Sequence, residues 1–315
     1  MRIVFLGTGG TYPSKTRNVS SIAVQIGPDV VMLDCGEGTQ RQLMHSPVSF
    51  MRIRAIFITH LHADHFLGLP GLVQSMSLNG RTERLSVYGP ASTADTVRAM
   101  LALGHFRSQF PVEARDVSAG DEMDFGSFTV RVAEASHTVP ALAYAALEKP
   151  RRGRFNLERA RTLGVPEGPK FRELQEGRAV EIGGREVKPE DVMGGDRPGR
   201  KVVYSGDTRP CEAVESLSTD ADVLIHDSTL SSEQSALASE FGHSTAAEAA
   251  EIAKSAGVEA LYLVHISPRY EDASVLLAEA TNVFPNSHIA HDLDVVEVKH
   301  RRPGSQLEHA ARGGG

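Results

Sequence analysis

Short apolar runs, bounded by turns and polar residues, recur through the first hundred residues of the chain. They are four to six residues long and rich in β-branched residues, which is typical of buried strands. The expected strands are Arg2–Leu6, Ser21–Ile26, Val30–Leu33, Arg54–Thr59 and Leu85–Tyr88. Helices are expected after three of them, at Thr39–Met44, Asp64–Leu78 and Ser92–Leu103. Strands and helices therefore alternate in this part of the chain.

The chain then becomes richer in expected strands, at Val112–Val117, Phe128–Ala135 and Ala141–Glu148. After residue 200 the alternation resumes, with strands expected at Lys201–Tyr204, Val223–His226, Ala260–Val264 and Ile289–Val298. The helices expected among them are Ser244–Ala256 and Ala273–Phe284. This order of elements predicts an α/β fold with two sheets enclosed by helices.

Residues 149–200 depart from the pattern of the rest of the chain. They are rich in glycine, proline and charge, and helical patterns occur only at Asn156–Leu163 and Phe171–Gln175. We expect this segment to be an excursion from a core domain that spans residues 1–302. The tail, residues 303–315, is low in apolar content, and we expect it to be disordered.

Composition and charge narrow the class of protein. No apolar run reaches about 18 residues, so no transmembrane helix is expected. Cys35 and Cys211 are the only cysteines, which gives no disulfide framework and indicates a reducing, cytoplasmic setting. A net charge of −7 argues against a general nucleic-acid-coating protein. Residues 149–201, however, hold 14 Lys and Arg against 9 Asp and Glu, a local charge of +5 on an otherwise acidic chain.

The most unusual stretch for chemistry is Thr59–His65. Three histidines and an aspartate fall within six residues, directly after an apolar run that ends an expected strand. Unpaired ionisable groups are costly to bury in such a place. Imidazole and carboxylate together are the ligands that zinc prefers, so the pattern His60-x-His62-x-Asp64-His65 predicts a metal site.

Three further residues can complete a site for two metal ions. His137, Asp207 and His265 each follow an apolar β run, so each is delivered by a rigid element. A single histidine or aspartate at a strand end is typical of a capping or solvated residue. Together with the four ligands at residues 60–65, they make seven ligands, which complete two metal sites with none left over.

Several motifs resemble those of the RNase Z family of the metallo-β-lactamase superfamily, the endonucleases that mature tRNA 3′ ends. The resemblance runs over nearly all of residues 1–300, and it is carried by Thr59–His65 and by these further segments: Phe5–Gly9, Pro13–Asn18, Asp34–Gln40 and His243–Thr245. It implies a four-layer αβ/βα sandwich of the metallo-β-lactamase type, with a mid-chain arm. It also implies a homodimer.

The resemblance implies a role for each residue of the metal motif. Two zinc ions per subunit are implied, one held by His60, His62 and His137 and the other by Asp64, His65 and His265, with Asp207 bridging the two. Asp64 would also orient the attacking water or take its proton. His243 would assist the leaving oxygen. By the same resemblance, cleavage 3′ of the tRNA discriminator base would leave a 3′-hydroxyl on the tRNA and a 5′-phosphate on the trailer.

Two segments are expected to contact precursor tRNA. The loop residues Lys15, Arg17 and Asn18 resemble the family's substrate loop. Gly164–Lys170 is similar to part of the family's tRNA-binding exosite, so residues 149–200 are expected to form that arm. Its basic side chains would meet the phosphate backbone, namely Arg151, Arg152, Arg154, Lys170 and Arg172. Each segment could also be a solvated loop without a ligand.

Two alternatives to an RNA-processing enzyme stay open. A hydrolase of the same fold could act on small phosphodiesters, sulfate esters or lactones, although such a substrate needs neither the arm nor the Lys15–Asn18 loop. A catalytically inactive RNA-binding subunit could keep the fold, although the presence of all seven ligands argues against it. His226, which follows an apolar strand, is expected to be structural or to support the ligands.

Overall fold

The computed structural model describes residues 1–300, and the chain divides into two compact units. The first unit contains Met1–Glu148 and Arg200–Lys299, and the second contains Lys149–Gly199. The tail expected at residues 303–315 lies outside the described residues. Within residues 1–300, none of the helices has both the length and the apolar character needed to cross a membrane.

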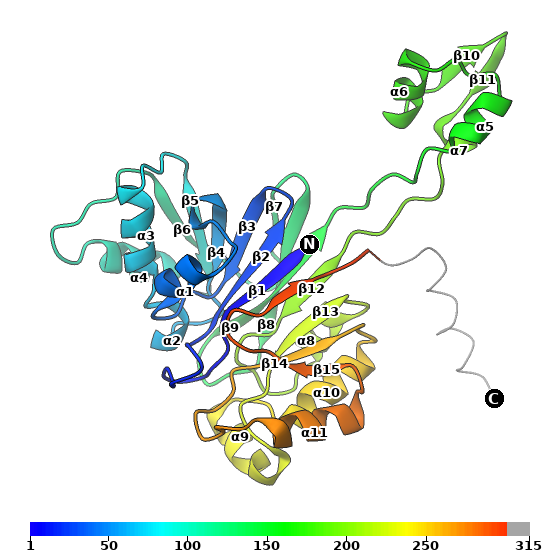
Figure 1. Ribbon diagram of the computed structural model, residues 1–315. Coiled ribbons are helices and arrows are strands. Elements are labelled where there is room, and N and C mark those ends of the chain that lie inside the picture. The colour runs from blue at the N-terminus through cyan, green and yellow to red at the C-terminus, as the bar shows by residue number, and fades with distance from the viewer. Residues whose placement is uncertain (301–315) are drawn as a thin grey trace. The chain divides into compact units, whose positions relative to one another are not determined.

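One seven-stranded sheet of the first unit has the order β16-β1-β2-β3-β4-β5-β6 (Figure 1). Its strands are β1 (Arg2–Gly7), β2 (Ser21–Ile26), β3 (Asp29–Leu33), β4 (Ile53–Phe57), β5 (Leu85–Gly89), β6 (Val112–Asp116) and β16 (Val295–Glu297). β1, β2 and β3 pair antiparallel, whereas β3 to β6 pair parallel. The carboxyl ends of β3 and β4 therefore lie at one edge of the sheet.

The second seven-stranded sheet has the order β15-β14-β13-β12-β9-β8-β7. Its strands are β7 (Glu122–Asp124), β8 (Phe128–Ala135), β9 (Ala141–Glu148), β12 (Lys201–Tyr204), β13 (Val223–Asp227), β14 (Leu261–Val264) and β15 (Ser287–Ile289). β12 to β15 pair parallel, so their carboxyl ends share one edge of this sheet.

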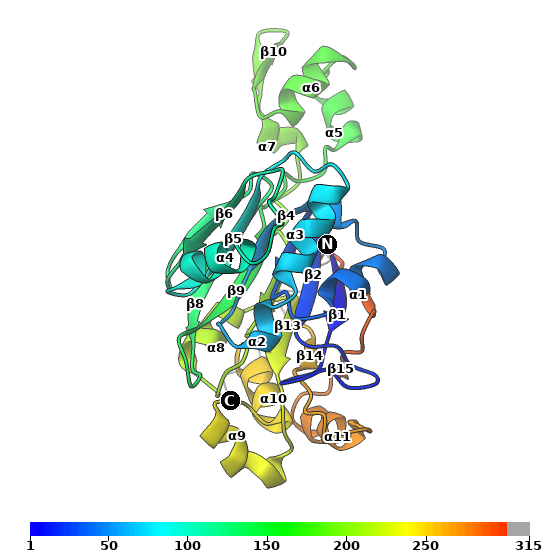
Figure 2. The same cartoon turned by 90° about the vertical axis from the view of Figure 1, so that its left-hand side faces the viewer.

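Successive side chains of a strand face two different apolar cores in turn. In β1, Phe5 faces a core that it shares with Tyr144 of the other sheet, while Leu6 packs with Leu72 of a helix. Beyond the second sheet, Leu224 packs with Ala249 and other helical residues. Figures 1 and 2 show the helices on the outer faces of the two sheets. The predicted α/β fold, a four-layer αβ/βα sandwich, is confirmed.

The helices belong to two outer layers. Those beside the first sheet are α1 (Thr39–His45), α2 (Ala63–Phe66), α3 (Leu69–Leu78) and α4 (Thr93–Leu101), with a 3₁₀ turn at Phe50–Arg52. Those beside the second sheet are α8 (Glu212–Ser218), α9 (Ser235–Phe241), α10 (Ala246–Ser255) and α11 (Ser274–Val283), with a 3₁₀ turn at Ser232–Gln234. Thr245 caps α10 through a reciprocal pair of hydrogen bonds with Glu248.

Two of the predicted elements are divided in the structure. The strand expected at Ile289–Val298 is divided into β15 and β16, which belong to different sheets, with a turn at Leu293 in the left-handed region (φ 67°). The helix expected at Asp64–Leu78 breaks into α2 and α3 at Gly68. A Cβ there would lie 2.0 Å from the carbonyl oxygen of Gly36, so the chain approaches too closely for any other residue.

The second unit has a small core of its own. Its elements are α5 (Leu157–Thr162), α6 (Pro169–Gln175), the hairpin of β10 (Val180–Ile182) and β11 (Arg185–Val187), and α7 (Pro189–Val192). Ala160, Leu174 and Val187 are buried together within it. The segment is therefore a compact subdomain, with helices where the sequence predicted them.

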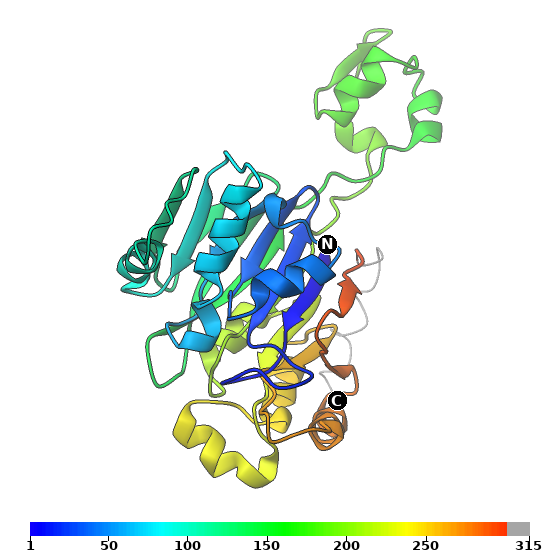
Figure 3. The same cartoon turned by 60° about the vertical axis from the view of Figure 1, so that its left-hand side comes forward.

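The first unit brings two connecting segments together at the edge formed by the strand ends. The loop after β1 lies beside the segment that follows β14, as the blue and orange traces of Figure 3 show. The backbone N–H of Gly10 donates to the carbonyl oxygen of Ile266 over 3.1 Å, and Gly9 forms a bridge with the same residue. The loop after β1 is therefore fixed to the segment that carries His265.

Candidate metal centre

All seven predicted ligands meet at the carboxyl ends of the strands. His60, His62, Asp64 and His65 follow β4, His137 follows β8, Asp207 follows β12 and His265 follows β14. Their ligand atoms form three overlapping sets, each within 4.8 Å: His60, His62 and His137; Asp64, His65 and His265; and His60, His65 and Asp207. This arrangement of imidazoles and carboxylates suits the binding of divalent metal.

Asp207 occupies the position between the two outer sets. Its Oδ2 lies 3.7 Å from His60 Nε2, 3.4 Å from His65 Nε2 and 3.2 Å from His265 Nε2. Burial opposes the charge of this carboxylate. The neighbouring imidazoles of His265 and His65 nevertheless hold its pKa well below the usual range. Asp207 is therefore ionised and can serve ions on both sides.

Three buried ligand atoms have no hydrogen-bond partner: His65 Nε2, His265 Nε2 and Asp207 Oδ1. Buried polar atoms are rarely left in this state, because the lost hydration is not replaced. Burial, and then the charge of His65, hold the pKa of His60 well below its usual value. Its imidazole is therefore neutral, which suits a metal ligand. The carboxylates of Asp207 and Asp34 instead hold the pKa of His65 well above its usual value despite burial, so this ring would release a proton on binding a metal. The residues present fit a metal centre.

Hydrogen bonds on the far nitrogen fix the orientation of three ligands. His65 Nδ1 lies 2.7 Å from Asp34 Oδ2, His265 Nδ1 lies 2.8 Å from Thr229 Oγ1, and His137 Nδ1 lies 2.8 Å from the carbonyl oxygen of Gly242. In each ring the other nitrogen, Nε2, is then directed at the shared centre.

Asp34 supports the cluster and was not assigned a role from the sequence. It is fully buried, in the left-handed region (φ 61°), and it also accepts hydrogen bonds from Thr59 and from the Tyr204 hydroxyl. Its only sequence signal was its place in the Asp34–Gln40 motif. Its partners come from β12 and from the segment after β4, which adjacent sequence does not reveal.

His243 lies next to the cluster and is held by a second carboxylate. Its Nδ1 lies 2.8 Å from Asp227 Oδ2, at the end of β13. Burial lowers the pKa of His243, but the carboxylates of Asp227 and Asp207 together raise it to about 9. The imidazole is thus set to carry a proton near neutral pH. Asp227 was not singled out from the sequence.

The cluster opens into a cleft of about 580 Å³. Asp64, Asp207 and His243 line its polar part. The other side chains of its walls include two aromatic rings and a cation: Thr11, Tyr12, Leu230, Leu237, Phe241, Pro268 and Arg269. Sequence reasoning missed Arg269, an exposed residue four positions after His265. The cleft offers a polyanionic substrate both a cation and apolar walls.

The three residues of the predicted substrate loop differ in placement. Lys15 is exposed. Asn18 is half-buried, and its side chain donates to the carbonyl oxygen of Glu37 over 2.8 Å. Arg17 is buried, and its Nη1 donates to Thr8 Oγ1 and to the carbonyl oxygen of Ala290, both at 2.6 Å.

The expected substrate contact of Arg17 therefore needs correction. Its guanidinium is committed to internal acceptors, with Asp292 nearby, and it fixes the loop to the protein. Of the loop's two cations, Lys15 is the one that reaches solvent.

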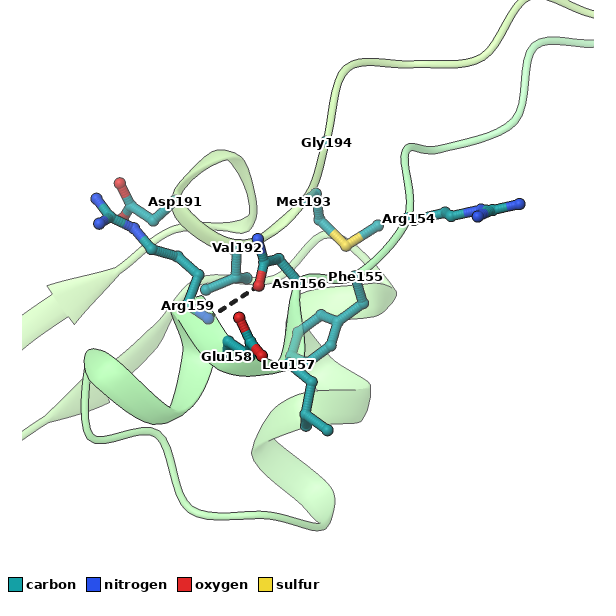
Figure 4. Close-up of a pocket in the computed structure, with 10 residues that line it drawn as sticks. All are labelled: Arg154, Phe155, Asn156, Leu157, Glu158, Arg159, Asp191, Val192, Met193 and Gly194. Atoms are coloured by element: carbon teal, nitrogen blue, oxygen red, sulfur yellow. Dashed lines mark hydrogen bonds between the residues drawn. The ribbon is translucent and has the colours of Figure 1, made fainter. Parts of the chain in front are cut away.

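The basic residues expected to bind tRNA lie in the second unit. Arg151, Arg152 and Arg154 are exposed, and Lys170 Nζ donates to the carbonyl oxygen of Glu181 over 2.6 Å. Arg154 also lines a pocket of about 560 Å³ at the start of α5, where Asn156 caps the helix by accepting from the Arg159 N–H at 2.9 Å (Figure 4).

His226 supports the same edge from inside the protein. It is fully buried at the end of β13, with Nδ1 2.8 Å from the carbonyl oxygen of Asp227, and its Nε2 has no hydrogen-bond partner. Burial lowers its pKa, so the ring is neutral. It lies outside the three ligand sets and outside the fourth group among the described residues that could hold a metal, which consists of Asp207, Asp227, His243 and His265.

Comparison of the whole chain with known proteins gives a consistent result. A ribonuclease Z of Methanosarcina acetivorans is 48% identical over 302 residues, which cover 96% of this chain and 99% of the relative. A ribonuclease Z of Myxococcus xanthus is 43% identical over 301 residues, covering 95% and 98%. Family models of the anti-Pycsar protein Apyc1 and of the beta-lactamase superfamily domain match residues 1–144 and 177–266.

Solved structures show the same architecture. The short form of human tRNase Z superposes with a TM-score of 0.70 at 28% identity, covering 95% of this chain and all of that one. A metallo-β-lactamase-fold protein of Bacillus subtilis gives a TM-score of 0.68 at 19% identity, covering 94% and 98%, which shows the fold alone. The fold is thus of the metallo-β-lactamase type, and the relatives share it over their full length.

Proposed function

This chain belongs to the ribonuclease Z family and is an endonuclease of that family, and we propose that it is a zinc-dependent endoribonuclease that cleaves precursor tRNA 3′ of the discriminator base. The products would be a tRNA with a 3′-hydroxyl and a trailer with a 5′-phosphate. The observation that carries the proposal is the cluster of seven ligands, in which three buried nitrogen and oxygen atoms have no hydrogen-bond partner.

We propose that two zinc ions are held as the ligand sets suggest. His60, His62 and His137 would hold one ion, Asp64, His65 and His265 the other, and Asp207 would serve both. When bound, such a pair neutralises charge on a phosphodiester and makes water a better nucleophile at neutral pH. Manganese or iron also suits histidine and aspartate ligands.

The residues around the ions would divide the proton transfers. Asp64 faces the cleft, where its carboxylate can orient the attacking water and accept a proton from it. His243, protonated through its contact with Asp227, would donate a proton to the leaving 3′ oxygen. His243 and Asp64 line the same cleft, as the acid and base of an in-line displacement must.

Binding of the rest of the tRNA would rest on cations outside the cluster. Lys15 and, in the second unit, Arg151, Arg152 and Arg154 are exposed and can contact phosphates without reading sequence. Lys170 could join them once its carbonyl contact is exchanged. We also propose a homodimer, in which the arm of one subunit holds the tRNA that the other cleaves.

We further propose that the enzyme works in the cytoplasm. Both cysteines are free thiols, and Cys35 is fully buried in the core. Burial raises the pKa of the Cys35 thiol to about 12, which keeps it unreactive.

The proposal is tested by comparing two substrates. A 3′-extended precursor tRNA and bis(p-nitrophenyl) phosphate are each incubated with the intact protein, and kcat/KM is measured for both. We expect the precursor to be strongly preferred. Equal or greater activity on the small diester would instead support a small-molecule hydrolase, and binding of the precursor without zinc or cleavage would support an inactive RNA-binding subunit.

A further inference from the structure

Two exposed aromatic rings line the cleft over the ligand cluster. The chain has twelve phenylalanines and six tyrosines, all within residues 1–300. Only Tyr12 (59% exposed) and Phe241 (55% exposed) are classed as exposed, and both border the same cleft. Aromatic rings usually contribute to stability by burial, so their exposure at one site indicates a ligand that covers them.

Tyr12 is tied to one of the two outer ligand sets. The backbone N–H of Thr11 donates to Asp64 Oδ2 over 2.9 Å, and Asp64 forms a set with His65 and His265. The Tyr12 N–H donates in turn to the carbonyl oxygen of Gly10 over 2.8 Å. The backbone that carries the Tyr12 ring is therefore fixed relative to this set.

Phe241 is tied to the other set. It is the last residue of α9, and the carbonyl oxygen of the next residue, Gly242, lies 2.8 Å from His137 Nδ1. A Cβ at Gly242 would lie 2.6 Å from the same nitrogen, and its φ is +80°, so glycine is required there. His137 forms the set with His60 and His62. Each exposed ring is thus one residue away from a backbone group that holds a ligand.

We infer that Tyr12 and Phe241 each stack on an unpaired base of the RNA, one on either side of the scissile phosphodiester. The inference rests on the proposed function, because it takes single-stranded RNA as the occupant of the cleft. A phosphodiester in RNA carries a nucleoside on each side, which matches one ring beside each ligand set. Stacking on an aromatic ring suits any base.

The rest of the cleft favours this occupant over an apolar protein segment. Its floor carries Asp64, Asp207 and His243, which would be costly to cover with apolar groups. Arg269 is exposed in the same lining and supplies a positive charge for the backbone phosphates. Apolar faces for bases and a cation for phosphates are the two features of single-strand binding sites.

The inference makes a statement about specificity. Because rings select stackable bases and not hydrogen-bonding patterns, the two positions should require that the flanking nucleotides are unpaired, with little preference for their identity. A base-paired nucleotide is already stacked in its own helix, and its unstacking would oppose binding.

The test uses precursor tRNAs with 2-aminopurine, or an abasic residue, in place of the base on either side of the cut. The intact zinc-loaded protein is mixed by stopped flow, so that fluorescence reports stacking and product analysis reports cleavage. The variants are Tyr12→Ala, Phe241→Ala and the conservative Tyr12→Phe. Leu103→Ala, an exposed apolar residue outside the cleft lining, is the matched control.

We expect each alanine variant to lower kcat/KM by roughly 5- to 150-fold and to abolish quenching at one position only. An abasic residue at that position should remove the effect of the variant. Tyr12→Phe and Leu103→Ala should resemble the wild type on precursor tRNA, and Leu103→Ala should leave hydrolysis of bis(p-nitrophenyl) phosphate unchanged.

Three results would overturn the inference while the proposed function stands. The first is full activity of both alanine variants, and the second is an equal loss of kcat/KM by these variants on normal and on abasic precursors. The third is a change of oligomeric state in the variants, which would show that the rings pack on a second copy of the chain. A wild-type protein that fails to cleave any precursor would instead remove the proposed function, and the inference with it.

Discussion

Thr11 and Asp64 are joined by a hydrogen bond of 2.9 Å, from the backbone N–H of one to Oδ2 of the other. Thr11 makes this contact from the left-handed region (φ 68°), which costs a β-branched residue about 1–2 kcal/mol. The fold thus accepts strain in the loop after β1 in order to orient a carboxylate of the cluster. Asp64 Oδ2 also lies 3.6 Å from His65 Nε2 and 3.6 Å from His265 Nε2.

Asp64 should therefore be needed for both metal binding and turnover. Asp64→Ala removes one ligand of the Asp64, His65 and His265 set and the proposed proton acceptor. We expect bound zinc to fall from about two ions to about one per subunit and turnover to fall by at least about 10²–10⁴-fold. Metal analysis and steady-state kinetics check this. Asp95→Ala, on the exposed face of α4, is the control, and unchanged zinc content in Asp64→Ala would contradict the ligand assignment.

His243 should matter for turnover but not for metal content. Its nearest carboxylate is Asp227 at 2.8 Å, whereas Asp207 lies 3.9 Å away, so His243→Ala should lower kcat by about 10²–10⁴-fold while bound zinc stays near the wild-type value. Both are measured on the same preparation. If zinc is lost in proportion to activity, His243 is part of the metal centre and not the proton donor.

The pH dependence of cleavage should depend on Asp227. Burial lowers the pKa of His243, whereas Asp227 and then Asp207 raise it to about 9, so the proton donor is charged below that pKa and activity is lost as pH rises through it. Asp227→Asn removes the charge that favours the protonated ring. The alkaline limb of kcat/KM should then move to lower pH.

The measurement is a pH–rate profile of Asp227→Asn, with the same substitution in a His243→Ala background as the control. The alkaline limb should be absent from His243→Ala and from the double variant that also carries Asp227→Asn. An alkaline limb that stays at the wild-type pH in Asp227→Asn would show that another group supplies the proton. A thermal unfolding curve checks that Thr208 and Thr229, which also donate to Asp227, still hold the fold.

The arm should contribute to binding and not to chemistry. The Glu148 N–H donates to the carbonyl oxygen of Arg200 over 2.9 Å, so the two ends of the insertion are adjacent and a short Gly-Ser linker can replace residues 149–199. We expect KM for precursor tRNA to rise by about tenfold or more and its dependence on salt to weaken, because phosphate contacts are lost. Hydrolysis of bis(p-nitrophenyl) phosphate serves as the control, and its loss would contradict the division of roles.

Lys15 and Arg17 should respond differently to truncation. Lys15→Ala removes an exposed cation, so KM for precursor tRNA should rise without loss of stability. Arg17→Ala removes buried charged hydrogen bonds to Thr8 and Ala290, so the free energy of unfolding should fall by roughly 1.5–3 kcal/mol. Urea unfolding and kinetics separate the two. Equal stability of both variants would contradict the internal role of Arg17.

The sequence predicted the layers of the fold because its short apolar runs are consistent with buried strands. It also predicted that the polar residues after β4, β8, β12 and β14 belong together, because their imidazoles and carboxylates complete the ligands of two metal sites. It could not predict the partners of these residues. Asp34 and Asp227 act through single hydrogen bonds to His65 and His243, which depend on tertiary packing.

Two predictions failed because contacts between distant parts of the chain outweighed the local sequence pattern. Arg17 has the sequence context of a solvated loop, yet its guanidinium satisfies the carbonyl of Ala290, far away in the chain. The last predicted strand was divided because residues between β15 and β16 cross from one sheet to the other.

Helix α9, which carries Phe241, has mostly small and polar residues and gave no periodic pattern.

The most direct test of the two-metal account is to map the cut in a labelled 3′-extended precursor tRNA, before and after metal removal. The protein is incubated with the precursor as prepared, after treatment with a chelator, and after zinc is restored. We predict a single cut 3′ of the discriminator base, with a 3′-hydroxyl on the tRNA and a 5′-phosphate on the trailer. The cut should be lost with the chelator and recovered with zinc. Cleavage at that position in the chelator-treated protein, at a zinc content near zero, would contradict the account.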